Sequence, residues 1–218
     1  MNTRLVGAVL LSLCMVCCTP APSPAPPAPQ PSAAPSGSSA PAVAGTGWEG
    51  PWARFHSKRH DAWLQLPNGP TWRIDDHKSS WLVAKHPTTN TALRFKLYRD
   101  EHAVNRDKCE AMARREDPTL PREDETAIDR ADALLPGWDS HAFSVVSTGK
   151  KGGGPVVGQY LAWGAAIRRC FVLHVSTSSE SPAGAAQVGA RLADLPELMK
   201  KVSFEDATEG PGRLPVGP

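Results

Sequence analysis

The sequence predicts a single α+β domain, an antiparallel sheet covered by helices, behind an N-terminal segment that does not fold. Three observations indicate this class. Short segments alternate apolar and polar residues, two other segments space apolar residues at helical intervals, and the Pro-rich residues 20–41 show neither pattern. The expected order is four strands, a helix, three strands and a helix, which is typical of an antiparallel sheet with helices packed on it.

Three of the first four strands are short, at Ala62–Leu66, Thr71–Asp75 and Trp81–Lys85, and polar turns separate them. The fourth, Leu93–Tyr98, has the clearest alternation, so one of its faces is apolar and the other amphipathic. That amphipathic face is a candidate binding surface, and it carries Arg94, Lys96 and Tyr98.

A helix is expected over Val104–Arg115, because Cys109, Met112 and Ala113 lie on one side at helical spacing. Residues 116–132 are acidic and contain two prolines, so they are expected to form a long surface segment. A short helix is expected to begin in this region and to continue just beyond it, over Glu123–Leu134.

Three further strands are expected at Ala142–Thr148, Val156–Trp163 and Ile167–Ser176, the first two joined by a Gly-rich turn. The last is apolar on both faces at its centre, as expected of an internal strand. A final helix begins at Ser181, with Pro182 in its first position, and Phe204 packs as the chain leaves the domain.

The N-terminus has the pattern of a secretion signal: a short basic head followed by the apolar stretch Leu5–Val16. Met15-Val16-Cys17-Cys18 resembles the lipobox of bacterial lipoproteins, with Met in place of the usual Leu. The resemblance implies removal of residues 1–17 and lipidation of Cys18. Lipidation of Cys17 would place the bulky Val16 before the cut, and a plain signal peptide is the other alternative.

Residues 18–47 form the lipidated cysteine and a tether rich in Pro, Ala and Ser, without charge before Trp48 or periodicity. Such a segment is expected to stay disordered and extended, as is the tail at residues 208–218. The anchor's partner would be a lipid bilayer. Thr19, rather than Asp, after the lipidated cysteine favours the outer membrane over the inner one, with the domain in the periplasm or outside.

The domain, residues 48–207, has a size and element order similar to the PsbP-like fold, which includes small lipoproteins of the DcrB type. The lead-in WLQLPNGPTWRI at residues 63–74 contributes to this resemblance. The group consists mainly of non-catalytic binding or assembly factors. The resemblance therefore implies a binding role and transfers no active site.

Only Cys109 and Cys170 remain in the domain once the signal is removed. A domain outside the cytoplasm is in an oxidising compartment, so the two are expected to form a disulfide between the first helix and a central strand. Two buried free thiols are the alternative.

The sequence contains no assembled catalytic or metal motif, so no catalytic residue, metal or cofactor is expected. His56 and His60 are four residues apart but lack the Glu of a zinc helix motif. Residues 149–155 are Gly-rich but lack the spacing of a phosphate loop, and Asp139-Ser140-His141 are adjacent, unlike the separated members of a triad.

Trp48 and Trp52 precede the first strand among Gly and Pro residues. They either fold back onto the domain or form an exposed aromatic patch for a glycan or an envelope protein. The net charge of +2 gives no reason to expect nucleic-acid binding.

Together these observations predict a membrane-anchored envelope lipoprotein with a non-catalytic binding or assembly role, and not an enzyme. An envelope hydrolase with an unrecognised site is one alternative. A lipoprotein that binds a small ligand or a metal near His56 and His60 is another.

Overall fold

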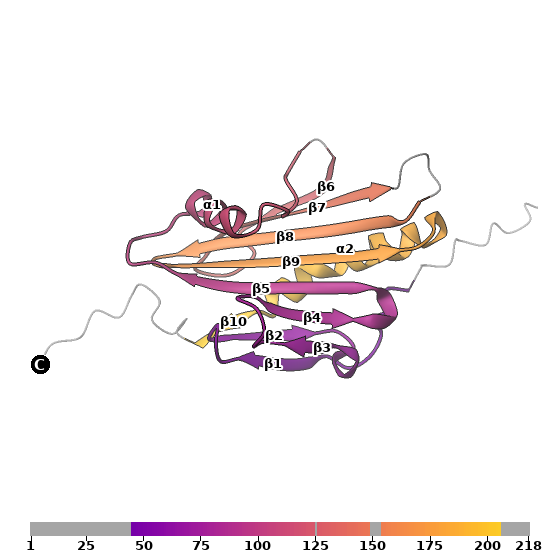
Figure 1. Cartoon of the computed structure of the whole chain (residues 1–218), viewed down its shortest axis with the longest axis horizontal. Coiled ribbons are helices and arrows are strands. Elements are labelled where there is room, and N and C mark those ends of the chain that lie inside the picture. Colours follow the sequence, from indigo (N-terminus) through magenta and orange to yellow (C-terminus); the bar gives the residue numbers. More distant parts are fainter. Residues whose placement is uncertain (1–44, 125, 149–153, 206–218) are drawn as a thin grey trace, which may run out of the picture. The chain divides into compact units, whose positions relative to one another are not determined.

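The computed structural model describes residues 45–124, 126–148 and 154–205. A seven-stranded antiparallel sheet forms the centre of the fold, in the order β3-β4-β5-β9-β8-β7-β6 (Figure 1). Its strands are β3 (Arg73–Asp75), β4 (Leu82–His86), β5 (Thr91–Arg99), β6 (Ala127–Asp132), β7 (Asp139–Thr148), β8 (Val156–Ala166) and β9 (Arg169–Ser179).

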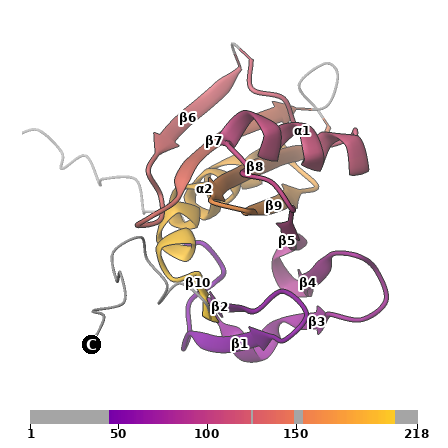
Figure 2. The same cartoon turned by 90° about the vertical axis from the view of Figure 1, so that its left-hand side faces the viewer.

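A smaller antiparallel sheet in the order β1-β2-β10 contains β1 (Ala53–Ser57), β2 (Ala62–Leu66) and β10 (Ser203–Phe204). The helices α1 (Arg106–Glu116) and α2 (Ala185–Lys200) both pack against β8 and β9. They do so from opposite faces of the large sheet (Figure 2). The predicted α+β class is therefore confirmed.

Because both faces of the large sheet are covered in part, there are two hydrophobic clusters. One lies between the sheet and α2 and extends into the small sheet, and the other lies under α1. Gly158 allows α2 to approach β8 closely, since a Cβ atom there would lie 2.6 Å from Val188 and 2.9 Å from Leu192. The apolar centres of β8 and β9 thus follow from their position between two helices.

The disulfide predicted between Cys109 and Cys170 is confirmed. It joins α1 to β9, and both residues are fully buried. The Asn105 side chain caps the same helix by accepting a hydrogen bond from the Lys108 amide at 2.9 Å. Helix α1 is therefore fixed at its N-terminal end, through the cap at Asn105 and the disulfide at its fourth residue.

The helix expected over Glu123–Leu134 is wrong, because Ala127–Asp132 form the edge strand β6, paired with β7. Most of its side chains are exposed, and Ile128 is 60% exposed, so no alternation of buried and exposed residues marks it as a strand. The sequence also gave no indication of β1 or β10. The last helix begins at Ala185, after a 3-10 turn at Pro182–Gly184, and continues through Pro196.

The chain segment before β1 packs onto the large sheet through Trp48 and Arg191. The Trp48 indole N–H donates to Thr89 Oγ1 at 3.2 Å. Arg191 of α2 donates to the carbonyl oxygens of Thr46 and Thr89, at 2.6 and 3.0 Å, and to Thr177 Oγ1 at 3.1 Å. Residues 46–48 are therefore held at the end of the sheet where β4 and β5 connect.

The predicted signal (residues 1–17), the lipidated Cys18, nearly all of the tether and the tail at residues 208–218 lie outside the described residues. Neither described helix has the length and apolar character that crossing a membrane requires.

Candidate functional site

A cleft of about 490 Å³ lies at the end of the large sheet where β4 and β5 connect. In Figure 1, this connection and α1 lie at opposite ends of the sheet. The cleft is lined by Arg73, Lys85, His86, Pro87, Asn90, Thr91, Ala92, Val157, Ser176, Thr177 and Ser178.

Strand register explains why a hollow forms here. Arg73, Lys85, Ala92, Ser176 and Gln159 follow one another across β3, β4, β5, β9 and β8, and all project from the face that carries α1. Ala92 and Ser176 have small side chains, whereas Arg73 and Lys85 beside them have long ones. The hollow therefore lies over the small residues.

We divide this sheet face into two parts. The covered half is packed under α1 and the residues that directly follow it. The open half carries Arg73, Lys85, Ala92, Ser176 and Ser178, and among the described residues no helix packs over it.

The open half is positively charged. The lining of its cleft contains Arg73 and Lys85 and no carboxylate, and neither cation forms an ion pair with another described residue. The two occupy directly opposite positions on β3 and β4. Arg191 of α2, which is 5% exposed, donates to Thr177, a residue of the cleft lining.

The predicted binding surface of Arg94, Lys96 and Tyr98 belongs to the covered half instead. Arg94 Nη1 pairs with Asp117 Oδ2, and Lys96 Nζ lies 2.6 Å from Glu116. Tyr98 packs edge-on against Trp81 at a centroid distance of 6.4 Å, and burial raises its pKa. This surface prediction is wrong, because α1 and its C-terminal carboxylates occupy the amphipathic face.

His174 lies between the two halves, opposite Arg94 on β5 and Leu161 on β8. Its Nε2 is 3.2 Å from the Gln159 side-chain oxygen. Burial lowers the pKa of His174 to about 4, and the nearby Arg94 acts in the same direction. His174 is therefore neutral at pH 7 and adds no charge to the site.

The two N-terminal tryptophans have different environments. Trp48 is 3% exposed and packs beside Trp72 at a centroid distance of 6.3 Å, so of the two alternatives it follows the one in which it folds back onto the domain, and it is not part of an exposed patch. Trp52 is 42% exposed, and Lys201 Nζ lies 4.9 Å from its ring. The expected aromatic patch is reduced to Trp52.

His56 and His60 do not converge on a common site. His56 stacks on Trp63 at 4.1 Å and lies 2.8 Å from Glu205, whereas the buried His60 accepts a hydrogen bond from the Leu97 amide at 3.3 Å. Within the three described ranges, no three His, Cys, Asp or Glu side chains are grouped as a metal site would require. The arrangement gives no support to the metal alternative.

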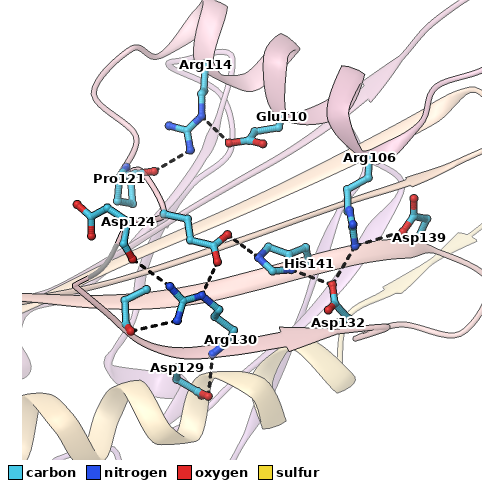
Figure 3. A network of polar contacts seen from close by, with 12 residues as sticks. Arg106, Glu110, Arg114, Pro121, Asp124, Asp129, Arg130, Asp132, Asp139 and His141 are labelled. Atoms are coloured by element: carbon cyan, nitrogen blue, oxygen red, sulfur yellow. Dashed lines mark hydrogen bonds and ion pairs between the residues drawn. The ribbon is translucent and has the colours of Figure 1, made fainter. Parts of the chain in front are cut away.

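A second polar cluster lies beside α1, on β6 and β7 (Figure 3). His141 Nε2 is 2.9 Å from Glu123 and Nδ1 is 2.8 Å from Asp132, and this second hydrogen bond lowers the pKa of Asp132. Arg106, the first residue of α1, also bonds Asp132, at 2.9 Å. Arg130 pairs with Glu123.

These contacts connect β6, β7, α1 and the segment between α1 and β6. Every carboxylate that contacts His141 is also paired with an arginine, so the cluster has no carboxylate left to bind a ligand. We interpret this cluster as structural: its ion pairs and hydrogen bonds stabilise the exposed edge strand β6.

Arg73 and Lys85 were not singled out from the sequence. Both residues lie in segments that the sequence predicts to be strands. That they stand directly opposite each other, with no carboxylate paired to either, depends on strand register, which the sequence alone does not supply.

No protein-family profile and no curated protein matches the sequence. Among solved structures, the chain is similar to the Ran-binding protein Mog1p of Saccharomyces cerevisiae, with 12% identity and a TM-score of 0.50 over 72% of this chain and 97% of that one. It is also similar to a protein of Bacteroides thetaiotaomicron, with 11% identity, a TM-score of 0.45 and 72% of this chain covered. The match spans about half of that protein, 49% of its length.

Proposed function

We propose that this chain is a lipid-anchored protein of the bacterial envelope whose folded domain acts by binding. One observation carries the binding role: a cleft of about 490 Å³ opens on the half of the sheet that α1 does not cover. Concave sites with a few polar groups converging on them are the usual form of ligand sites.

The lipobox-like residues Met15-Val16-Cys17-Cys18 support the anchor. They follow a basic head and an apolar stretch, as a secretion signal requires. The disulfide between Cys109 and Cys170 is consistent with an oxidising compartment. Mog1p, which shares the fold, is a Ran-binding protein, and this supports binding as a role for a domain of this fold.

Labelling with a fatty-acid analogue in a bacterial host tests the anchor. The wild-type chain should incorporate the label, and Cys18→Ala should not. Cys17→Ala is the matched control and should still incorporate it. Continued labelling of Cys18→Ala would refute the assignment of Cys18.

Site-specific photo-crosslinking tests the binding role. A crosslinking residue at position 92, in the floor of the cleft, should capture a discrete partner in cells. The same residue at position 168, in the exposed turn between β8 and β9 at the far end of the sheet, is the control. Equal capture at both positions, or none at position 92 across several growth conditions, would count against a binding role for the open half.

A further inference from the structure

We infer that the cleft of the open half binds a phosphate group, and that Arg73 and Lys85 are the residues that hold it. This assignment rests on the proposed binding role of the open half and specifies the ligand's chemistry. It follows from three features: an unpaired pair of cations, a floor of small residues with hydroxyl groups, and a buried arginine that donates to a residue of the cleft lining.

The cation pair is the first feature. Arg73 and Lys85 are register partners on adjacent antiparallel strands, so their Cβ atoms are close and both side chains project from the same face. Like charges in directly opposite positions destabilise a sheet. A group with two negative charges removes this repulsion when it binds, and a phosphate monoester carries a charge between about −1.5 and −2 at neutral pH.

The surroundings of the pair do not already neutralise it. Asp75 is the carboxylate on β3 nearest in sequence, and it accepts hydrogen bonds from the amides of His77 and Lys78 at 3.0 and 3.1 Å. It also lies 3.7 Å from Lys78 Nζ. Asp75 and Lys78 line a second hollow, to which Arg73 and Lys85 also contribute. The described polar contacts of the Asp75 carboxylate are therefore with the turn that follows β3, and none is with Arg73 or Lys85.

The floor and wall of the cleft add hydrogen-bond donors. Ser176 and Ser178 project from β9 beside Ala92, and Asn90 donates to Ser178 Oγ at 2.5 Å, which fixes the rim. Hydroxyl groups can donate to phosphate oxygens, and Arg and Lys are its common charged partners.

Arg191 supplies the third feature. Its guanidinium is almost fully buried, and its described hydrogen-bond partners are two carbonyl oxygens and the Thr177 hydroxyl, with no carboxylate among them. Its Nη1 donates to the hydroxyl of Thr177, a residue that lines the cleft. In a partly buried environment such a charge is screened less than a surface charge, so it favours an anion in the cleft.

Nuclear magnetic resonance on the purified, ¹⁵N-labelled full-length chain tests the inference, with sodium phosphate added at constant ionic strength. We expect saturable shifts of the amides of Arg73, Lys85, Ala92 and Ser176. Arg73→Ala and Lys85→Ala should each weaken binding by about tenfold or more, as expected when a charge-assisted hydrogen bond is lost. Arg168→Ala removes the same charge from the exposed turn at the other end of β9 and should leave the affinity unchanged.

Three results would overturn the inference. They are the absence of saturable shifts, an equal loss of affinity in Arg168→Ala, and acetate binding as tightly as phosphate. If crosslinking at position 92 captures a partner while phosphate produces no saturable shift, the phosphate assignment fails and the proposed binding role stands. If both experiments are negative, both proposals fail.

Two further arms identify where the phosphate resides. Glycerol phosphate is the soluble probe, and vesicles of equimolar phosphatidylcholine and phosphatidic acid are the membrane probe, with phosphatidylcholine vesicles as the blank. Lys85-dependent binding to glycerol phosphate without a gain on vesicles assigns a soluble phosphate ester. Tighter, Lys85-dependent binding to the phosphatidic acid vesicles assigns a lipid headgroup. Binding to both vesicle types alike, independent of Lys85, contradicts the phosphate site.

Discussion

The two halves of one sheet face differ in whether their positively charged side chains are paired with carboxylates. In the covered half, Arg94 and Lys96 on β5 meet Asp117 and Glu116 at the end of α1. In the open half, the neighbouring strands carry Arg73 and Lys85, and no described carboxylate reaches them. The difference arises because the helix that supplies the counter-charge covers only one end of the sheet.

This difference separates residues that stabilise the fold from residues available for binding. When an ion pair is partly shielded from water, removing one of its residues lowers the stability of the fold, because the other charge is left without a partner. An exposed pair of like charges contributes nothing favourable to folding. The four predictions below test whether this division holds.

Removing the disulfide should have the largest effect, and it acts on the covered half. The bond closes a sequence separation of 61 residues, for which the chain-entropy model gives about 4 kcal/mol of stabilisation. Urea denaturation of Cys109→Ala/Cys170→Ala should show a loss approaching this value. Hydrogen exchange should rise more in α1 than in β4. An unchanged urea midpoint, or equal acceleration in both elements, would refute the assigned role of the bond.

Acid should destabilise the boundary between the halves through His174. Its pKa is about 4 in the folded chain, below the ordinary value of 6.5, so the unfolded chain binds the proton first as the pH falls. The stabilisation is therefore complete above pH 6.5 and is lost as the pH falls through about 4. The pKa difference corresponds to a loss of about 3 kcal/mol.

Urea midpoints at pH 7 and pH 4 measure this loss. His174→Gln should show a smaller decrease between the two pH values than the wild-type chain. His77→Gln, which changes an exposed histidine in the turn between β3 and β4, is the control and should keep the wild-type decrease. An identical decrease in all three proteins would show that His174 does not titrate in this way.

Truncating one arginine in each half compares them directly. Arg94→Ala leaves Asp117, whose side chain is 11% exposed, without its cation and should cost about 1–3 kcal/mol. Arg73→Ala removes an exposed and unpaired charge and should change stability by less than about 0.5 kcal/mol. Chemical denaturation of both variants at pH 7 decides between them. Equal losses would remove the distinction between the two halves.

Reversing one charge in the open half should have the smallest effect and the opposite sign. Lys85→Glu places a carboxylate directly opposite Arg73 and should stabilise the domain by roughly 0.2–1 kcal/mol. Thermal denaturation of this variant without ligand measures the gain, and Lys85→Ala should fall between it and the wild-type chain. A lower melting temperature for Lys85→Glu would contradict the repulsion on which the phosphate inference depends.

Much of the fold could be predicted from the sequence, because the spacing of apolar residues, alternate in strands and every three or four in helices, indicates which faces are buried. β5, β9 and α1 have one or both faces in a hydrophobic cluster, and their sequences carry that pattern. β6 could not be predicted in this way. It is an edge strand held by charged side chains, and Ile128 points outward, so its residues record little burial.

The candidate site was less predictable than the fold. Alternation in Leu93–Tyr98 correctly placed Arg94 and Lys96 on one face of a strand. It could not show that Glu116 and Asp117, about twenty residues later, return to that face. The cysteine pairing could be predicted because only two cysteines remained and the compartment was inferred. Arg73 and Lys85 form a site only through the register of β3 and β4.

The hydrogen bonds of Arg191 also determine how the domain responds to mechanical force. The chain reaches the fold at Thr46, whose carbonyl oxygen Arg191 binds together with the Thr89 carbonyl and the Thr177 hydroxyl. A pull on the N-terminal side of Thr46 therefore meets α2, β9 and the β4–β5 connection before it reaches β1. The tension is shared among three elements instead of peeling one strand from the small sheet, and it arrives at the end of the domain where the cleft opens.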